Sequence, residues 1–150
     1  METKAIPLPE HGSCFICGSQ NPKGMGLVWY AQANEAQSEL VFSKFAFTLA
    51  EQGPPGHAHG GASAAVLDEA MGAVVWRSGL KVVLANMNLN YHKPVPLNMP
   101  LRVEAWLDRT EGRKAFATGR IVLMNEGETA VSGTGLYIHA PHLFTFDYYG

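Results

Sequence analysis

Residues 60–78 read Gly-Gly-Ala-Ser-Ala-Ala-Val-Leu-Asp-Glu-Ala-Met-Gly-Ala-Val-Val-Trp-Arg-Ser, and this stretch decides the fold class. Its apolar residues surround the helical axis instead of forming one stripe, which is typical of a buried helix. Only Asp68, Glu69 and the terminal Arg77 bring charge to it. The Ser-Gly pair at 78–79 is a typical helix stop, because glycine readily takes the left-handed conformation of a C-terminal cap. The sequence therefore predicts one long buried helix.

Short runs with the character of strands lie on both sides of this helix. Before it they cover 26–32 and 36–43, joined at Ala33-Asn34-Glu35, and a further hydrophobic stretch follows at 45–49. After it they cover 81–91, 100–109, 113–124 and 129–139, with glycine-containing hairpin connections at 110–112 and 125–127. We expect two paired strands, the helix, and then a meander of four strands. This is an α+β fold with an antiparallel sheet wrapped round one long central helix.

The two ends of the chain differ from its middle in composition and in hydrophobic pattern. Residues 1–24 are rich in proline, glycine and asparagine and predict an irregular lead-in, whereas the aromatic tail at 140–150 has no period and gives no structural prediction. The length of 150 residues fits one domain with one core. No repeat or low-complexity tract marks a second unit, so we expect a single domain over 1–150.

The composition argues against several classes of protein. A net charge of −2 with scattered Lys and Arg does not suit a nucleic-acid surface, which needs a concentrated basic stripe. No uninterrupted apolar run approaches the ~20 residues that span a bilayer. Residues 1–10 lack the apolar stretch of a secretory signal, so we expect a cytoplasmic protein.

Hydrophobic residues make up 47% of the chain and charged residues only 16%. Few charges are therefore available for the surface, and some apolar surface is left for another copy of the chain to cover. We expect a homodimer, with a homotetramer as the alternative.

Two cysteines, Cys14 and Cys17, stand in a Cys-Phe-Ile-Cys-Gly motif. A structural zinc site has four ligands, so this pair needs two histidines from elsewhere or a second pair from a partner chain. The leading histidine candidate is His11, which alone is not enough. We expect two reduced thiols at a tight turn, no bound metal and no cofactor.

Asp68 is the main candidate for catalysis. A carboxylate in the middle of an otherwise apolar helix is costly unless it is paired, protonated or functional. Its alternative role is structural, with a hydrogen-bond partner on a neighbouring strand. Glu69 points roughly 100° away around the helix axis and is more easily explained by a helix end or by solvent.

His59, Gly60 and Gly61 stand where this helix begins. The first N–H groups of a helix have no partner within it, and the helix dipole favours negative charge there, so they suit a developing oxyanion. The alternative is an ordinary helix entry. Gly60 and Asp68 are eight residues apart, ~12 Å along a helix, and cannot both touch one carbonyl. If both are catalytic, each site takes Gly60 from one subunit and Asp68 from the other.

Four motifs carry a resemblance to a known family. They are Gly-Pro-Pro-Gly at 53–56, His-Gly-Gly at 59–61 with Asp68 after it, Ala-Asn-Met-Asn-Leu-Asn-Tyr at 85–91 leading to Lys-Pro-Val-Pro at 93–96, and Glu-Gly-Arg-Lys at 111–114. Together they resemble the PaaI-like branch of hotdog-fold acyl-CoA thioesterases, which includes the animal mitochondrial long-chain acyl-CoA type. The resemblance covers most of residues 14–139.

The resemblance implies a hotdog fold, dimers that join two sheets, and a tunnel for pantetheine between subunits. It implies that Asp68 acts as general base or nucleophile on the thioester, that the Gly60 N–H polarises its carbonyl, and that His59 positions the thioester. The expected reaction is hydrolysis of acyl-CoA or another acyl thioester. The alternative is a hotdog protein that binds acyl-CoA without turning it over; a hydratase or dehydratase usually places its His and acid differently around the helix.

Further residues are candidates for substrate binding: Gly61, His57, Asn86, Asn88, Met71, Arg113 and Lys114. Met71 fits an acyl tunnel or a core equally well. Arg113 and Lys114 could meet the CoA phosphates, although scattered surface cations usually contact only water.

Two positions depart from the pattern of the family. Relatives often carry Ser or Thr where this chain has Leu84, and many carry Asn or Gln where it has Gly53, with Gln52 beside it. The side chain of Leu84 cannot form a hydrogen bond, so another group must hold the attacking water, with Asn86, Asn88 or His57 as candidates.

Overall fold

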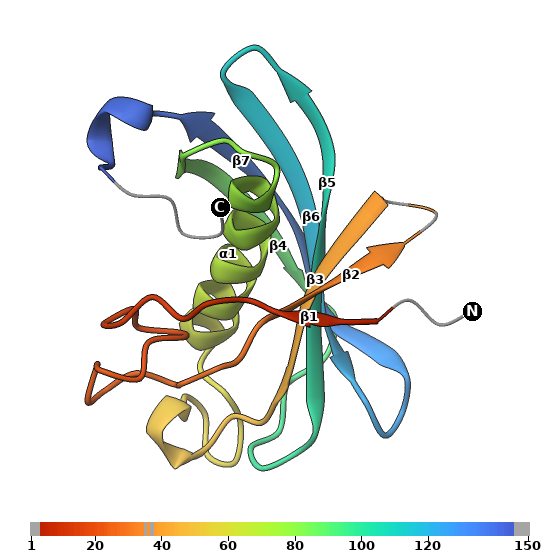
Figure 1. Ribbon diagram of the computed structural model, residues 1–150. Coiled ribbons are helices and arrows are strands. Elements are labelled where there is room, and N and C mark those ends of the chain that lie inside the picture. The colour runs from red at the N-terminus through yellow and green to blue at the C-terminus, as the bar shows by residue number, and fades with distance from the viewer. Residues whose placement is uncertain (1–3, 35, 37, 146–150) are drawn as a thin grey trace.

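The computed structural model describes residues 4–34, 36 and 38–145. In this part of the chain one helix, α1 (Gly60–Arg77), lies against one face of a curved sheet (Figure 1). The strands are β1 (Ile6–Pro7), β2 (Tyr30–Asn34), β3 (Ser38–Phe45), β4 (Val82–Tyr91), β5 (Leu101–Glu111), β6 (Lys114–Leu123) and β7 (Glu128–His139). Two short 3-10 helices, η1 (Leu49–Glu51) and η2 (Pro141–Leu143), complete the described elements. The predicted α+β class is confirmed.

The strand order is β1-β2-β3-β5-β6-β7-β4, and every neighbouring pair is antiparallel. The prediction of a four-stranded meander after the helix is wrong in one respect. Only β5, β6 and β7 form a meander, whereas β4 pairs with β7 and ends the sheet. The reason is that α1 crosses the sheet between β3 and β4, which brings the chain back at the far edge.

Local signals predicted most element boundaries well. The helix covers 60–77, and Gly79 after it has φ +101°. The two hairpin turns contain Gly112 and Gly127 with φ +60° and +70°, as such connections require. Two details differ: β1 is an unpredicted two-residue strand in the lead-in, and β2 begins at Tyr30 because the preceding Leu27 pairs with Ile16 of the N-terminal segment. The connection expected at 33–35 is also wrong for its first two residues, because Ala33 and Asn34 pair with β3 as part of β2; residue 35 lies outside the described residues.

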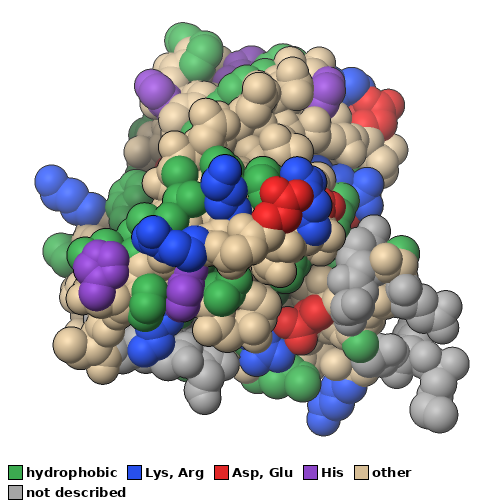
Figure 2. All heavy atoms as spheres, turned by 90° about the horizontal axis from the view of Figure 1, so that it is seen from above, with side chains coloured by type: hydrophobic (Ala, Val, Ile, Leu, Met, Phe, Trp, Pro, Cys, Tyr) green, Lys and Arg blue, Asp and Glu red, His purple; other side chains and the backbone are tan. Residues whose placement is uncertain are grey.

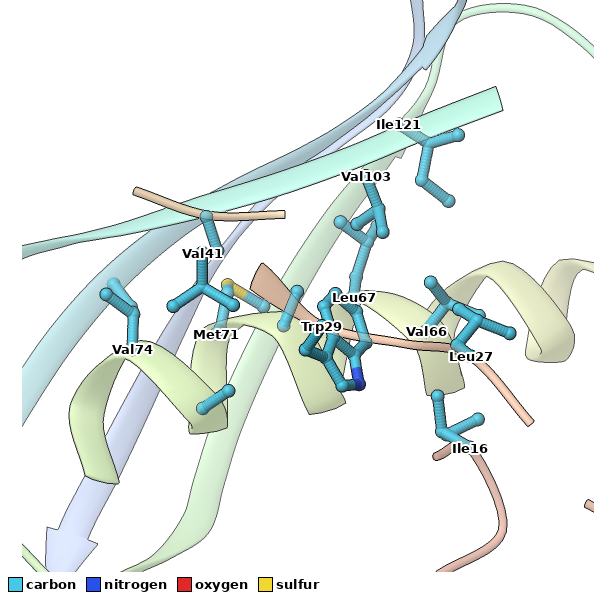
Figure 3. Packing of buried hydrophobic residues seen from close by; sticks show 14 of the residues in the cluster. Ile16, Leu27, Trp29, Val41, Val66, Leu67, Met71, Val74, Val103 and Ile121 are labelled. Atoms are coloured by element: carbon cyan, nitrogen blue, oxygen red, sulfur yellow. The ribbon is translucent and has the colours of Figure 1, made fainter. Parts of the chain in front are cut away.

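The core lies between α1 and the sheet. Val66, Leu67, Met71 and Val74 of the helix meet Val41, Val103 and Ile121 of the strands, and Ile16, Leu27 and Trp29 of the N-terminal segment close the core beside the helix (Figure 3). Gly119 on β6 lets the helix come close, since a Cβ there would lie 3.1 Å from Met71 Cγ and 3.2 Å from Leu67 Cδ2. This packing fixes the height and rotation of the helix over the sheet.

Within the described part of the chain, β4 leaves one long edge of the sheet unpaired. The strand has ten residues, most of them exposed, including the apolar Val83 and Leu84 and the aromatic Tyr91. Its register with β7 shifts between Leu84 and Asn86, so a bulge interrupts the alternation that predicted a half-buried strand. A long exposed edge with apolar side chains is a ready template for pairing with another strand.

Two surface features bear on the classes of protein that composition disfavoured. On the face in Figure 2, basic side chains are interspersed with acidic and hydrophobic ones and do not form one continuous stripe. Within 4–34, 36 and 38–145, no helix combines the length and the apolarity needed to cross a bilayer.

Candidate active site

Three hydrogen bonds hold the start of α1. His59, the N-cap residue, accepts the Gly61 N–H through Nδ1 at 2.8 Å, and its backbone carbonyl accepts the Ala62 N–H at 2.9 Å. From β4, the Tyr91 hydroxyl donates to the carbonyl of Gly60 at 2.7 Å. Because Nδ1 is an acceptor, the proton of a neutral His59 ring lies on Nε2. His59 is an exposed residue, so this N–H is available to a ligand.

These bonds distinguish the N–H of Gly60 from its neighbours. The Gly61 and Ala62 N–H groups have acceptors on His59, whereas the Gly60 N–H meets no acceptor among the described residues. Gly60 is also exposed and occupies the first position of the helix. An N–H at the positive end of the helix dipole stabilises negative charge on a bound carbonyl oxygen. Gly60 therefore offers the donor that its predicted role requires, and Gly61 does not offer a second one.

Asp68 faces β7. The hydroxyl of Tyr137 donates to the Asp68 carboxylate at 2.8 Å and to its backbone carbonyl at 3.0 Å. Burial raises the pKa of the Asp68 carboxyl above its usual value, and the hydrogen bond from Tyr137 opposes that rise. One hydrogen bond uses only part of the acceptor capacity of a carboxylate, so Asp68 can still accept a proton from a water molecule.

The two halves of the predicted site lie apart within one chain. Gly60 and Asp68 are separated by eight residues of continuous helix, ~12 Å along its axis. A cavity of about 170 Å³ lies beside Gly60 and Tyr91, and another of about 270 Å³ lies beside His59 and Gly61. Asp68 lines neither of them. A single chain thus presents the N–H donor in one place and the carboxylate in another.

The remaining candidates fall into different surroundings. Asn86 and Asn88 are exposed on the free edge strand β4, and His57 lies before the helix with Nδ1 at 3.0 Å from the carbonyl oxygen of Pro55. Met71 is fully buried against the sheet, which favours the core over the tunnel among its two predicted roles. Among the described residues, no hydrogen bond joins any of these four to Asp68.

Arg113 and Lys114 lie at the turn into β6, and both are exposed. Lys114 is paired with Ile138 and the next residue, Ala115, with Tyr137, so the two cations sit at the same end of the sheet as Asp68. The Arg113 Nε donates to the carbonyl of His139 at 3.3 Å. Their guanidinium and ammonium groups remain accessible to an anionic ligand.

The departure at Gly53 has a steric cause. A Cβ at this position would lie 2.7 Å from the Cα of His59, so the fold accepts only glycine there. The neighbouring Gln52 does not stand in for the missing amide, because its side-chain oxygen accepts the Gly56 N–H at 2.8 Å and so closes the Gly-Pro-Pro-Gly turn.

Sequence reasoning missed two tyrosines. In the sequence Tyr91 belongs to a motif and Tyr137 to an expected strand, with no sign of a further role, yet Tyr91 binds the start of the helix and Tyr137 binds Asp68. The signal for Tyr137 is weak: a tyrosine at a buried position of an alternating strand needs a partner for its hydroxyl. Its partner is 69 residues away in the sequence, which no local pattern reveals.

Comparison with known proteins shows the family of this chain. The family model of the thioesterase superfamily matches residues 55–130. Acyl-coenzyme A thioesterase THEM4 of Rattus norvegicus is 34% identical over 116 residues, covering 77% of this chain and 50% of that protein. THEM4 of Bos taurus is 32% identical over 124 residues, covering 83% of this chain and 50% of its own length.

Solved structures show the same fold. A thioesterase superfamily protein superposes with a TM-score of 0.76 at 32% identity, covering 85% of this chain and 60% of that one. A Bacillus halodurans protein solved with CoA superposes with a TM-score of 0.58 at 28% identity, covering 64% and 68% of the two chains. The chain belongs to the thioesterase superfamily, and the predicted hotdog fold is confirmed. It spans about half the length of the curated relatives it matches.

Proposed function

We propose that this chain hydrolyses acyl-CoA thioesters at sites shared between two copies. The observation that carries the proposal is the pairing of a half-buried carboxylate, Asp68, with an N–H at the helix start, Gly60, that has no acceptor among the described residues. Relatives at 32–34% identity are named acyl-coenzyme A thioesterases, and a structure at 28% identity was solved with CoA. We expect a cytoplasmic homodimer, with a homotetramer as the alternative.

The chemistry follows from these two groups. The Gly60 N–H polarises the thioester carbonyl and stabilises the oxyanion that forms when the carbonyl carbon is attacked. Asp68 takes a proton from water, whose oxygen bonds to that carbon, or attacks the carbon itself. When water attacks, the C–S bond then breaks and the departing CoA thiolate takes up the proton that Asp68 accepted. When Asp68 attacks, breakage of the C–S bond leaves an anhydride of Asp68 and the acyl group; water hydrolyses it to the free acid and Asp68, and the proton that this water releases goes to the CoA thiolate. The Nε2 N–H of His59, an exposed residue next to Gly60, helps to position the thioester.

The free edge of β4 supports the sharing of sites. Gly60 is bound through Tyr91 at the C-terminal end of this strand, and Asp68 is bound to Tyr137, which pairs with Leu84 near the other end. When two β4 edges pair antiparallel across a two-fold axis, opposite ends meet. Gly60 of one copy then approaches Asp68 of the other, which one chain alone cannot achieve.

Hydrolysis is tested with a panel of acyl-CoAs that runs from short to long and aromatic acyl groups, with release of free thiol as the readout. We expect turnover of at least one member of the panel. If the folded protein binds acyl-CoAs but releases no thiol from any of them, the non-hydrolytic alternative is correct instead.

We further infer that the hydroxyl of Tyr137 takes the role of the Ser or Thr hydroxyl that relatives carry at the position of Leu84. Leu84 pairs directly with Tyr137 across the two strands, so the Tyr137 hydroxyl reaches Asp68 beside the place where relatives carry Ser or Thr. It orients the carboxylate and lies next to the position of an attacking water.

Tyr137→Phe is expected to lower kcat about tenfold and to leave KM nearly unchanged, because a lost positioning hydrogen bond costs about 1.5 kcal/mol in the transition state. Steady-state kinetics separate the two constants. Tyr30→Phe is the matched control, since it removes a hydroxyl from a tyrosine that stacks on Phe42 far along the sheet. Equal losses in both variants, or a rise in KM alone, would contradict a positioning role.

A further inference from the structure

Four side chains of the types that commonly serve as metal ligands meet beside α1: His11, Cys14, Cys17 and Glu69. Their ligand atoms all lie within 4.8 Å of one another. The Glu69 Oε1 lies 3.6 Å from each cysteine Sγ and 3.3 Å from His11 Nδ1, and His11 Nδ1 lies 3.2 Å from the Sγ of Cys17. We propose that these four residues bind a zinc ion that fastens the N-terminal segment to the helix.

The distances suit tetrahedral coordination. Zinc binds N and O at ~2.0 Å and S at ~2.3 Å, which places tetrahedral ligand atoms ~3.3–3.8 Å apart. Four of the six separations run from 3.2 to 3.6 Å, and all six are within 4.8 Å, so the ligand atoms need to move by no more than about 1 Å to close round an ion. Two thiolates, an imidazole and a carboxylate form a set that selects zinc over magnesium or calcium. Four protein ligands leave no open position, so the site is structural.

The segment that carries the cysteines is built for this geometry. The Cys14 N–H donates to the carbonyl of His11 at 3.1 Å, and the Gly18 N–H donates to the carbonyl of Cys14 at 3.0 Å. A Cβ at Gly18 would lie 2.2 Å from the carbonyl oxygen of Gly12, so only glycine allows so tight a turn. The turn points both thiols at the helix, where they meet Glu69.

Burial favours a bound cation over an empty cluster. The side chain of His11 is 6% exposed, that of Glu69 is 23% exposed, and Cys17 is buried. A carboxylate placed next to two thiols in such surroundings loses hydration, and a divalent ion compensates for it. Because Glu69 points away from Asp68, the ion stabilises the fold without touching the reacting carbonyl.

The sequence predicted no metal here because Cys14 and Cys17 lacked a second pair of ligands. That premise is wrong, since the structure supplies the pair. His11 comes from the same turn, and Glu69 comes from a helix 52 residues beyond Cys17. The sequence favours solvent or a helix end for Glu69, because no local pattern shows that residues 1–24 fold onto α1.

The test uses the untagged full chain, purified after expression with zinc. Elemental analysis is expected to find about one zinc per chain. Replacement by Co²⁺ is expected to give a sulfur-to-cobalt charge-transfer band. The chain has only two cysteines, so that band can come only from Cys14 and Cys17. Neither readout depends on turnover, so the result is independent of the proposed hydrolysis.

Variants assign the ligands. Cys14→Ser with Cys17→Ser, and separately Glu69→Gln, are expected to lower bound zinc to less than about 0.1 per chain after dialysis. Glu10→Gln is the matched control: it removes a carboxylate beside His11 that binds Ser19 instead of the cluster, and it is expected to keep the zinc. A folded wild-type chain without zinc and without a cobalt charge-transfer band overturns the proposal, as does a disulfide between the two cysteines. If a variant fails to fold, the cobalt spectrum of the wild-type chain still shows whether the two cysteines bind a metal.

Discussion

Asp68→Asn is expected to lower turnover of acyl-CoA by ~10²-fold or more, which raises the barrier by ~2.7 kcal/mol. The amide keeps the shape of the side chain, but it can neither take a proton from water nor attack the thioester carbon. Because a neutral amide is cheaper to bury than a carboxylate, the melting temperature is expected to hold or rise. Thiol release and thermal melts measure the two effects separately.

The matched control is Asp108→Asn, the same chemical change at an exposed residue of β5 that binds Thr118. It is expected to keep normal turnover. Calorimetric titration of the Asp68→Asn variant with acyl-CoA shows whether the binding site is intact. Near-normal turnover in that variant would make Asp68 a structural residue, and His59 would become the next candidate.

Gly60→Pro is expected to lower kcat by ~10²–10³-fold, the usual effect of removing one oxyanion donor. Proline has no N–H, yet it is favoured at the first position of a helix. His59 before it has φ −63° and ψ 137°, the extended conformation that a residue preceding proline adopts. The substitution therefore removes the donor at small cost to folding, and kinetics with a responsive acyl-CoA measure the loss.

Gly60→Ala provides the matched control, since alanine keeps the N–H. A Cβ at this position meets nothing closer than the Tyr91 hydroxyl oxygen at 3.7 Å, an ordinary contact. The difference between the two variants therefore reports on the N–H alone. Equal kcat values for Gly60→Ala and Gly60→Pro would exclude Gly60 as the donor.

Mixing the two inactive chains tests whether the site is shared. A heterodimer of Asp68→Asn and Gly60→Pro contains one site with both groups intact and one site with neither. Random exchange makes half of the dimers mixed, so about a quarter of wild-type activity is expected to return. If each site took both groups from the same chain, mixing would restore nothing.

The features that the sequence predicted are those with local causes. The stretch at 60–78, with apolar residues on all sides of the axis, predicted the helix, and the glycines at 112 and 127 predicted the hairpins, because periodicity and positive φ are properties of neighbouring residues. His59 and Gly60 could also be placed, since the start of a helix always leaves N–H groups without partners inside it.

The features that the sequence could not predict depend on the path of the chain in space. Tyr137 reaches Asp68 across 69 residues, and Cys14 reaches Glu69 across 55. The position of β4 at the edge depends on where the chain re-enters the sheet after the helix. These contacts are set by the arrangement of the strands in the sheet, which local sequence patterns do not contain.

Asp68 and Glu69 are consecutive residues, yet one meets β7 and the other meets the N-terminal segment. Each residue of an α-helix advances by ~100°, so a single insertion or deletion between 61 and 67 would rotate both side chains by that angle. One such change would break both the hydrogen bond between Asp68 and Tyr137 and the contacts between Glu69 and the two cysteines. The number of residues between the glycine pair and the two acids therefore sets the direction in which both carboxylates point relative to the start of the helix.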